Sequence, residues 1–201
     1  MAGHMQATPL RADDLTAKAR IRNAALILFA ENGVDATSLR VVAEAAGVTV
    51  GLIVHHYGTK EALREAVELA IVDQFEVAIE SVPLNSQPPA KVVTERDLAV
   101  ARMLQQTPAI VDYLRRAILD GKGERGDLVS RLSELTAQQV RELRDAGLAS
   151  TKNTLGEQVI SIMVRQLGRL FLQPLVDQIA DEFAAELTGS QKPRLTVTVE
   201  H

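Results

Sequence analysis

Apolar residues recur every three or four positions along almost the whole of this 201-residue chain. This spacing places them on one face of an α-helix, whereas a half-buried strand would alternate at every second position. Between residues 16 and 32, one such face holds Ile21, Ala25, Leu28 and Phe29. Residues 195–199 alternate like a strand, but five residues at a terminus cannot form a sheet alone. The pattern therefore predicts an all-α fold.

Capping residues and breaks divide this pattern into separate helices. A threonine stands before the second, third and fourth expected helices, where its hydroxyl can accept from a free N–H group. These capping residues are Thr37, Thr49 and Thr59. The expected helices span 16–32, 37–46, 49–57, 59–82, 91–106, 108–119, 125–146 and 153–187. Pro174 should kink or divide the last of them.

The composition of the chain limits the kinds of site and the cellular location that it can have. The chain has no cysteine, which excludes disulfides and thiolate metal sites. Its net charge is −4, yet residues 1–65 balance their acidic and basic side chains, so the acidity belongs to residues 66–201. No apolar run is long enough for a membrane span, and the N-terminus lacks the apolar core of a signal peptide, so we expect a cytoplasmic protein. Residues 1–5 are interpreted as a cloning remnant.

Residues 39–58 fit two short helices that cross at a tight angle. Gly47 permits the turn between them. Small or apolar side chains would hold the pair together, namely Val42, Ala43, Ala46, Val48 and Ile53. This is the spacing of a helix-turn-helix, whose second helix lies in the major groove of DNA. The side chains expected to face DNA are Thr49, Val50, Gly51, Val54 and His55.

The run from Ala24 to Leu63 resembles the tetracycline-repressor (TetR) family of bacterial transcriptional regulators. It reads AALILFAENGVDATSLRVVAEAAGVTVGLIVHHYGTKEAL. The resemblance is carried by Phe29-Ala30-x-x-Gly33, Ala36-Thr37-Ser38, Ala43, Ala46-Gly47-Val48, Gly51 and Tyr57-x-x-Lys60-Glu61-Ala62-Leu63. It implies a homodimeric repressor that is released from a palindromic operator by a small molecule. The implied organisation is a DNA-binding domain over 14–60, a ligand-binding and dimerisation domain over 61–190, and a tail over 191–201.

Two positions of the expected recognition helix depart from the family's usual pattern. Val50 stands where the family commonly has Lys, and Val54 where it commonly has an aromatic residue. Val50 could instead meet a thymine methyl group. Affinity must then come from phosphate contacts at helix starts and from nearby basic residues. The further predicted DNA-binding residues are Thr37, Ser38, Arg40 and Lys60, with Lys18, Arg20 and Arg22 adding positive charge.

The C-terminal helices are expected to form the dimer and the ligand site. Between residues 155 and 180 apolar side chains cover most of the helix circumference, so this helix should be buried on two sides. The predicted dimer residues are Ile160, Val164, Gly168, Phe171 and Leu175. The predicted ligand-pocket residues are Phe75, Met103, Leu104, Tyr113, Leu114, Ile118 and Met163. A buried Tyr113 phenol would need a hydrogen-bond partner, which a ligand could supply.

The sequence offers little for catalysis or for metal binding. His55 and His56 are adjacent, so their side chains diverge by about 100° around a helix and cannot share one metal ion easily. We expect His56 to pack partly against the fourth helix, and we expect no metal, no cofactor and no enzymatic activity. Two other classes stay open, a helical adaptor that binds another protein and a small-molecule hydrolase or isomerase. Salt-dependent retention on DNA or heparin would separate the regulator from both.

Overall fold

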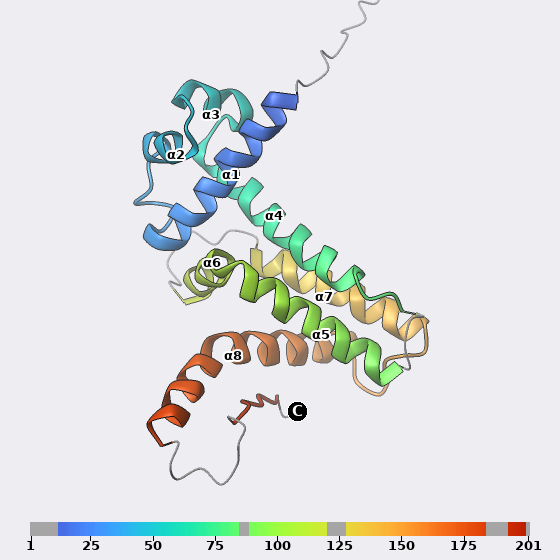
Figure 1. Ribbon diagram of the computed structural model, residues 1–201. Helices are drawn as coiled ribbons and strands as arrows, with labels where there is room; N and C mark the ends of the chain where they lie inside the picture. The colour runs from blue at the N-terminus through green and yellow to red at the C-terminus, as the bar shows by residue number, and fades with distance from the viewer. Residues whose placement is uncertain (1–11, 85–88, 120–127, 184–192, 200–201) are drawn as a thin grey trace, which may run out of the picture. The chain divides into compact units, whose positions relative to one another are not determined.

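The computed structural model describes residues 12–84, 89–119, 128–183 and 193–199 (Figure 1). These residues form helices and no strand, which confirms the all-α fold. The helices are α1 (Ala12–Asn32), α2 (Leu39–Ala46), α3 (Val50–Tyr57), α4 (Lys60–Glu80), α5 (Pro89–Gln106), α6 (Pro108–Leu119), α7 (Leu128–Asp145) and α8 (Leu155–Glu182).

The chain divides into two compact units whose limits differ from the expected domains. The first unit contains α1, α2, α3, the part of α4 up to Ile71, and α6. The second contains the rest of α4 from Val72, together with α5, α7, α8 and residues 193–199. The sequence pattern did not indicate that α6 would group with the N-terminal helices rather than with its neighbours in the chain.

The first unit is built around a core that the helical periodicity predicted. The side chains that are almost fully buried come from all five of its helices. They include Ile21, Phe29, Val42, Ile53, Leu63, Val67, Ile110 and Leu114. Short connections are possible because Gly33, Gly47 and Gly58 follow α1, α2 and α3 with positive φ, a conformation that costs glycine little.

The second unit buries one stripe of α5 and one of α7. The α7 stripe holds Leu128, Leu132, Leu135, Gln139 and Val140. Pro174 lies within α8 and does not divide it, and Figure 1 shows one helix that bends. Residues 193–199 form no strand, and two of their backbone groups bond to a side chain of α8. Gln173 Nε2 donates to Pro193 O at 2.9 Å, and Leu195 N donates to Gln173 Oε1 at 2.7 Å.

Candidate nucleic-acid interface

The α2 and α3 helices meet at the angle of a helix-turn-helix. The chain bends by 104° between them, within the range of about 90–120° that is typical of this motif. Gly47 makes the turn with φ 64°, and its N–H group donates to the carbonyls of Ala43 and Glu44. Val48 N donates to Ala43 O at 2.9 Å, which completes the end of α2. The predicted role of Gly47 is therefore confirmed.

Hydroxyl side chains cap the three helices that follow α1. Thr49 Oγ1 accepts from Leu52 N at 3.3 Å, and Thr59 Oγ1 accepts from Ala62 N at 3.1 Å, as predicted. At α2 the prediction was wrong by one residue, because Ser38 rather than Thr37 is the cap and accepts from Val41 N at 3.3 Å. Thr37 is 3% exposed, and its hydroxyl donates to Gly33 O at 2.7 Å. Its side chain fixes the turn after α1 and is not available to DNA.

One face of α3 is open to solvent. Val50 and Val54 are 39% and 48% exposed, although both are apolar, and Gly51 and His55 are exposed beside them. The opposite face carries Ile53, which is fully buried. Positions 50, 51, 54 and 55 lie on neighbouring helical rows, so the residues predicted to face DNA form one continuous surface. Contact with DNA remains a prediction.

Lys60 lies at the start of α4 and holds the loop before α2. Its Nζ donates to Val34 O at 3.0 Å and to Asp35 O at 3.3 Å. An ammonium group has three N–H donors, so these two bonds leave one donor for a phosphate. Ser38, Arg40 and Thr49 are exposed, as a phosphate-contacting role requires.

Tyr57 joins α3 to α1 through a contact that the sequence analysis missed. Its Oη donates to Lys18 O at 2.7 Å, and Lys18 Nζ lies 5.6 Å from the centre of the Tyr57 ring. Burial raises the pKa of Tyr57 above its ordinary value, while the charge of Arg22 opposes that rise. Both contacts fix α3 against α1. His56 is half-buried, and its Nε2 is buried without a hydrogen-bond partner among the described residues. Its packing against the fourth helix stays a prediction.

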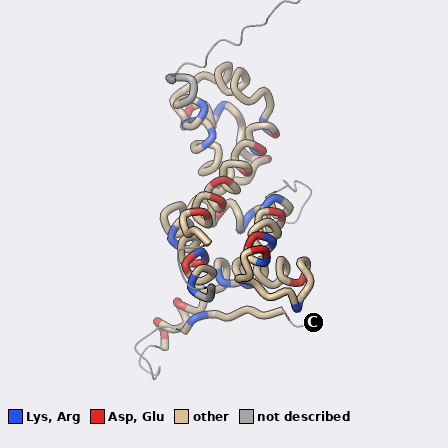
Figure 2. The backbone as a smooth tube through the Cα atoms, turned by 90° about the vertical axis from the view of Figure 1, so that its right-hand side faces the viewer, with Lys and Arg blue, Asp and Glu red and all other residues tan. Residues whose placement is uncertain are grey.

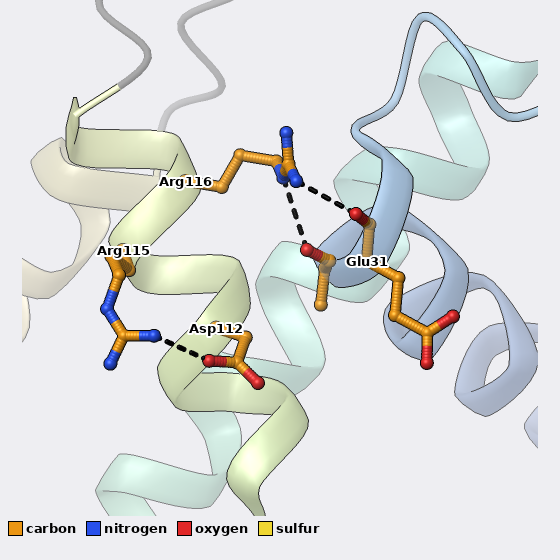
Figure 3. Close-up of polar contacts among 5 residues, drawn as sticks. Glu31, Asp112, Arg115 and Arg116 are labelled. Carbon is orange, nitrogen blue, oxygen red and sulfur yellow. Dashed lines mark hydrogen bonds and ion pairs between the residues drawn. The ribbon is translucent and has the colours of Figure 1, made fainter.

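Arg116 of α6 binds the end of α1. Its Nε donates to Ala30 O at 3.1 Å and its Nη2 to Glu31 O at 2.8 Å (Figure 3). These carbonyls belong to the last turn of α1, where a positive charge also interacts favourably with the helix dipole. Figure 3 shows the Glu31 carboxylate pointing away from Arg116, so the link uses the backbone. The same view shows the exposed ion pair between Arg115 and Asp112, at 2.7 Å.

A buried carboxylate joins α6 to α4. Glu68 is 2% exposed, and its Oε1 accepts from Tyr113 Oη at 3.0 Å and from Arg64 Nη1 at 2.9 Å. Burial and the charge of Glu68 together raise the pKa of Tyr113 well above its ordinary value. The sequence carried one local signal for this cluster, which is the spacing of four residues between Arg64 and Glu68 on one helix face.

The residues predicted to line a ligand pocket are not brought together within one unit. Tyr113, Leu114 and Ile118 belong to the first unit, whereas Phe75, Met103, Leu104 and Met163 belong to the second. Glu68 supplies the hydrogen-bond partner of Tyr113, so the reason for expecting a ligand at Tyr113 no longer holds. Leu114 is 1% exposed and belongs to the core of the first unit.

Among the predicted dimer residues, Ile160, Val164 and Leu175 are 51%, 40% and 53% exposed on α8. Gly168 has a role that the sequence did not predict. A Cβ atom there would lie 2.7 Å from Val197 Cγ2, so glycine is needed for residues 193–199 to pack on α8. Phe171 is half-buried.

Charge on the described helices is mixed, except on α4. That helix carries Glu61, Glu65, Glu68, Asp73, Glu76 and Glu80 against Lys60 and Arg64. The α3 helix carries no Lys, Arg, Asp or Glu, and Figure 2 shows both signs of charge on other described helices. No group of three or more metal-ligating side chains occurs in the part of the chain that the structure describes.

An all-α chain with a capped helix-turn-helix and an open α3 face has the architecture of a DNA-binding regulator. Comparison with known proteins supports this class. Residues 21–67 match the sequence profile of the "Bacterial regulatory proteins, tetR family". The transcriptional repressor Rv3405c of Mycobacterium tuberculosis is 31% identical over 175 residues, which cover 86% of this chain and 81% of the repressor. The chain therefore belongs to the TetR family, and the resemblance seen in its sequence is confirmed.

Two further similarities agree with this assignment. The transcriptional regulatory protein RaaS of Mycobacterium tuberculosis is 32% identical over 139 residues, covering 69% of this chain but only 60% of RaaS. In fold, the chain resembles a putative tetR family transcription regulator from Shewanella sp. PV-4. That structure has a TM-score of 0.65 and 21% sequence identity, and the match covers 84% of this chain and 93% of the other.

Proposed function

We propose that this protein is a homodimeric transcriptional repressor that binds a palindromic DNA operator and is released from it by a small molecule. The observation that carries the DNA-binding part is the open face of α3 at Val50, Gly51, Val54 and His55, held by capped helices at 104°. An exposed apolar face suits thymine methyl groups in the major groove. Phosphate contacts would come from the helix starts at Ser38, Thr49 and Lys60.

This proposal is tested by selecting bound sequences from a pool of random DNA duplexes. The selected duplexes are expected to contain an inverted repeat with half-site centres about 34–36 Å apart, or a multiple of that spacing. Affinity should fall steeply between 50 and 200 mM salt, since bound phosphates release counterions. An adaptor or an enzyme would select no sequence and would show no such salt dependence.

Lys60→Ala is expected to weaken binding to all DNA sequences alike. If Lys60 neutralises one phosphate, the slope of log affinity against log salt should flatten by about 1. Lys152→Ala is the matched control, because Lys152 is exposed in the second unit. Since Lys60 also donates to Val34 and Asp35, thermal unfolding of the variant must be measured in parallel. An unchanged slope would assign Lys60 a purely structural role.

The dimer part rests on the uncovered apolar surface of α8. Ile160, Val164, Leu172, Leu175, Ile179 and Phe183 are all at least 40% exposed. By length and composition alone this helix could cross a membrane, with a mean hydropathy of 1.3 and none of that window buried. A helix at a subunit interface has the same properties, and exposed patches of this kind mark interaction surfaces. A second copy of α8 related by a two-fold axis would cover the apolar surface.

Leu175→Asp is expected to convert the dimer into a monomer. Leu175 is 53% exposed in one protomer, so the variant should fold, yet in a dimer it would bury an unpaired charge. The dimer dissociation constant should rise by more than about 100-fold. Val77→Asp is the control, since Val77 is 68% exposed on α4. Sedimentation without detergent checks both, and a wild-type monomer at micromolar concentration would contradict the dimer.

Release by a ligand would act through α4, which is one continuous helix shared by both units. A ligand that prefers one tilt of α4 would change the separation of the two α3 helices, which DNA half-sites fix closely. A coupling of about 1–3 kcal/mol corresponds to about a 5–150-fold difference in DNA affinity with and without ligand.

A further inference from the structure

Arg96 is a cation in the interior of the second unit. It is 9% exposed and lies between Val92 and Ala99 in the buried stripe of α5, where the other positions are apolar. Removing a guanidinium from water costs several kcal/mol unless a partner compensates it. The buried position of Arg96 therefore needs an explanation.

The partners of Arg96 within hydrogen-bond distance are neutral. Its Nε donates to Val82 O at 3.1 Å, and its Nη1 donates to Gln139 Oε1. Gln139 is itself 8% exposed and lies in the apolar stripe of α7. No carboxylate of the described residues lies within ion-pair distance of Arg96. Glu80 and Glu142 act on it only at longer range, and burial lowers the pKa of Arg96.

A hydrogen bond between two long side chains, Arg96 and Gln139, joins α5 to α7. Within this unit, α7 packs closely against α8, whereas α5 meets α7 through the Arg96 and Gln139 side chains. On the α7 side, Leu132 and Leu135 are buried near Gln139 in the same stripe. Apart from Arg96 and Gln139, the buried side chains of the α5 and α7 stripes are apolar.

We propose that Arg96 binds the anionic group of a small amphipathic ligand, a carboxylate or a phosphate attached to an apolar body. A guanidinium presents five N–H donors in a planar fork that fits two oxygens of either group. The bonds to Val82 O and Gln139 Oε1 use two of these donors and orient the fork. This assignment rests on the ligand response proposed above, and it names the class of ligand.

The test uses the full chain and three ten-carbon probes, namely decanoate and decyl phosphate below their micelle concentrations and decanol below its solubility limit. Binding is measured by calorimetry without DNA, so a failure to bind DNA would not affect the result. At least one of the two anions is expected to bind about tenfold or more tightly than decanol. Comparing the anions shows whether a carboxylate or a phosphate is preferred. Equal binding of all three probes, or no binding of either anion, would overturn the proposal.

Substitutions in α5 test whether Arg96 is the residue that causes the preference for an anionic probe. Arg96→Met should lose about tenfold or more in affinity for the preferred anion and leave decanol unchanged, while Arg96→Lys should keep part of the preference. Arg102→Met, at an exposed position of the same helix, should bind as the wild type does. If Arg96→Met folds and keeps the anion preference, Arg96 only ties α5 to its neighbours. If it does not fold, Arg96→Lys decides, and an anion preference that this variant keeps in full would overturn the assignment to Arg96.

Discussion

Replacing Glu68 by Ala is expected to destabilise the first unit by about 2–4 kcal/mol. The substitution removes the carboxylate oxygen that accepts from Tyr113 Oη. Tyr113 is only 4% exposed, so water cannot easily replace this acceptor. It also removes the ion-pair partner of Arg64, whose side chain is 23% exposed and can still reach water. The loss of the acceptor for the buried Tyr113 phenol therefore accounts for most of the lost stability. Because Arg64 can reach water, the expected loss is smaller than that for breaking a fully buried ion pair.

Thermal unfolding checks this expectation. A loss of 2–4 kcal/mol should lower the unfolding midpoint by roughly 4–16 °C for a chain of this size. Asp73→Ala is the control, since Asp73 is exposed on the same helix and should change stability by less than about 0.5 kcal/mol. Glu68→Gln should fall between the two, because an amide oxygen can still accept from Tyr113 but carries no charge. Equal midpoints for Glu68→Ala and wild type would show that Tyr113 finds another partner.

The Glu68 cluster also bears on how a signal would reach the DNA-binding helices. Through Tyr113, α6 is joined to α4, and through Arg116 it is joined to the last turn of α1. All of these contacts lie within the first unit. A displacement of α4 or α6 would therefore be felt by α1, against which Tyr57 fixes α3.

Local chemistry explains which features the sequence could predict. The caps at Thr49 and Thr59 depend on a hydroxyl and the three residues that follow it, so they can be recognised without tertiary structure. At α2 two hydroxyl residues stand side by side, and the carbonyl of Gly33 decides between them by binding Thr37. A proline inside a helix removes one N–H group, so a kink in the helix that contains Pro174 was likewise predictable, and α8 does bend (Figure 1).

The polar contacts of the interior could not be predicted, because their partners are distant in the chain. Tyr113 and Glu68 are 45 residues apart, Arg96 and Gln139 are 43 apart, and Arg116 and Ala30 are 86 apart. A single sequence shows only that a charged residue interrupts an apolar stripe, as Arg96 does. It does not show which helix will lie opposite, and the grouping of α6 with the N-terminal helices escaped prediction for the same reason.

The stability of the protein is expected to fall with rising pH above about 10, and Tyr113 should contribute a measurable part of that fall. Burial and the charge of Glu68 raise the pKa of Tyr113 above its ordinary value of 10.0. Below pH 10 the phenol is neutral in both the folded and the unfolded chain, so its protonation adds no pH dependence. Above pH 10 the unfolded chain releases this proton while the folded chain keeps it. Each further pH unit then lowers the free energy of unfolding by about 1.4 kcal/mol.

Tyr113→Phe isolates this contribution, since lysine and arginine titrate alike in both proteins. Near pH 8 the wild type should be the more stable by about 1–2 kcal/mol, because the variant leaves the Glu68 carboxylate with one fewer donor. The difference should shrink above pH 10 and change sign roughly half a unit to one and a half units higher. The chain has two tyrosines and no tryptophan, so phenolate absorbance follows the titration directly. The pKa of Tyr57 is also raised by burial, which makes Tyr57→Phe the matched comparison. A stability difference between wild type and Tyr113→Phe that stays constant from pH 9 to pH 12 would show that the fold does not keep Tyr113 protonated.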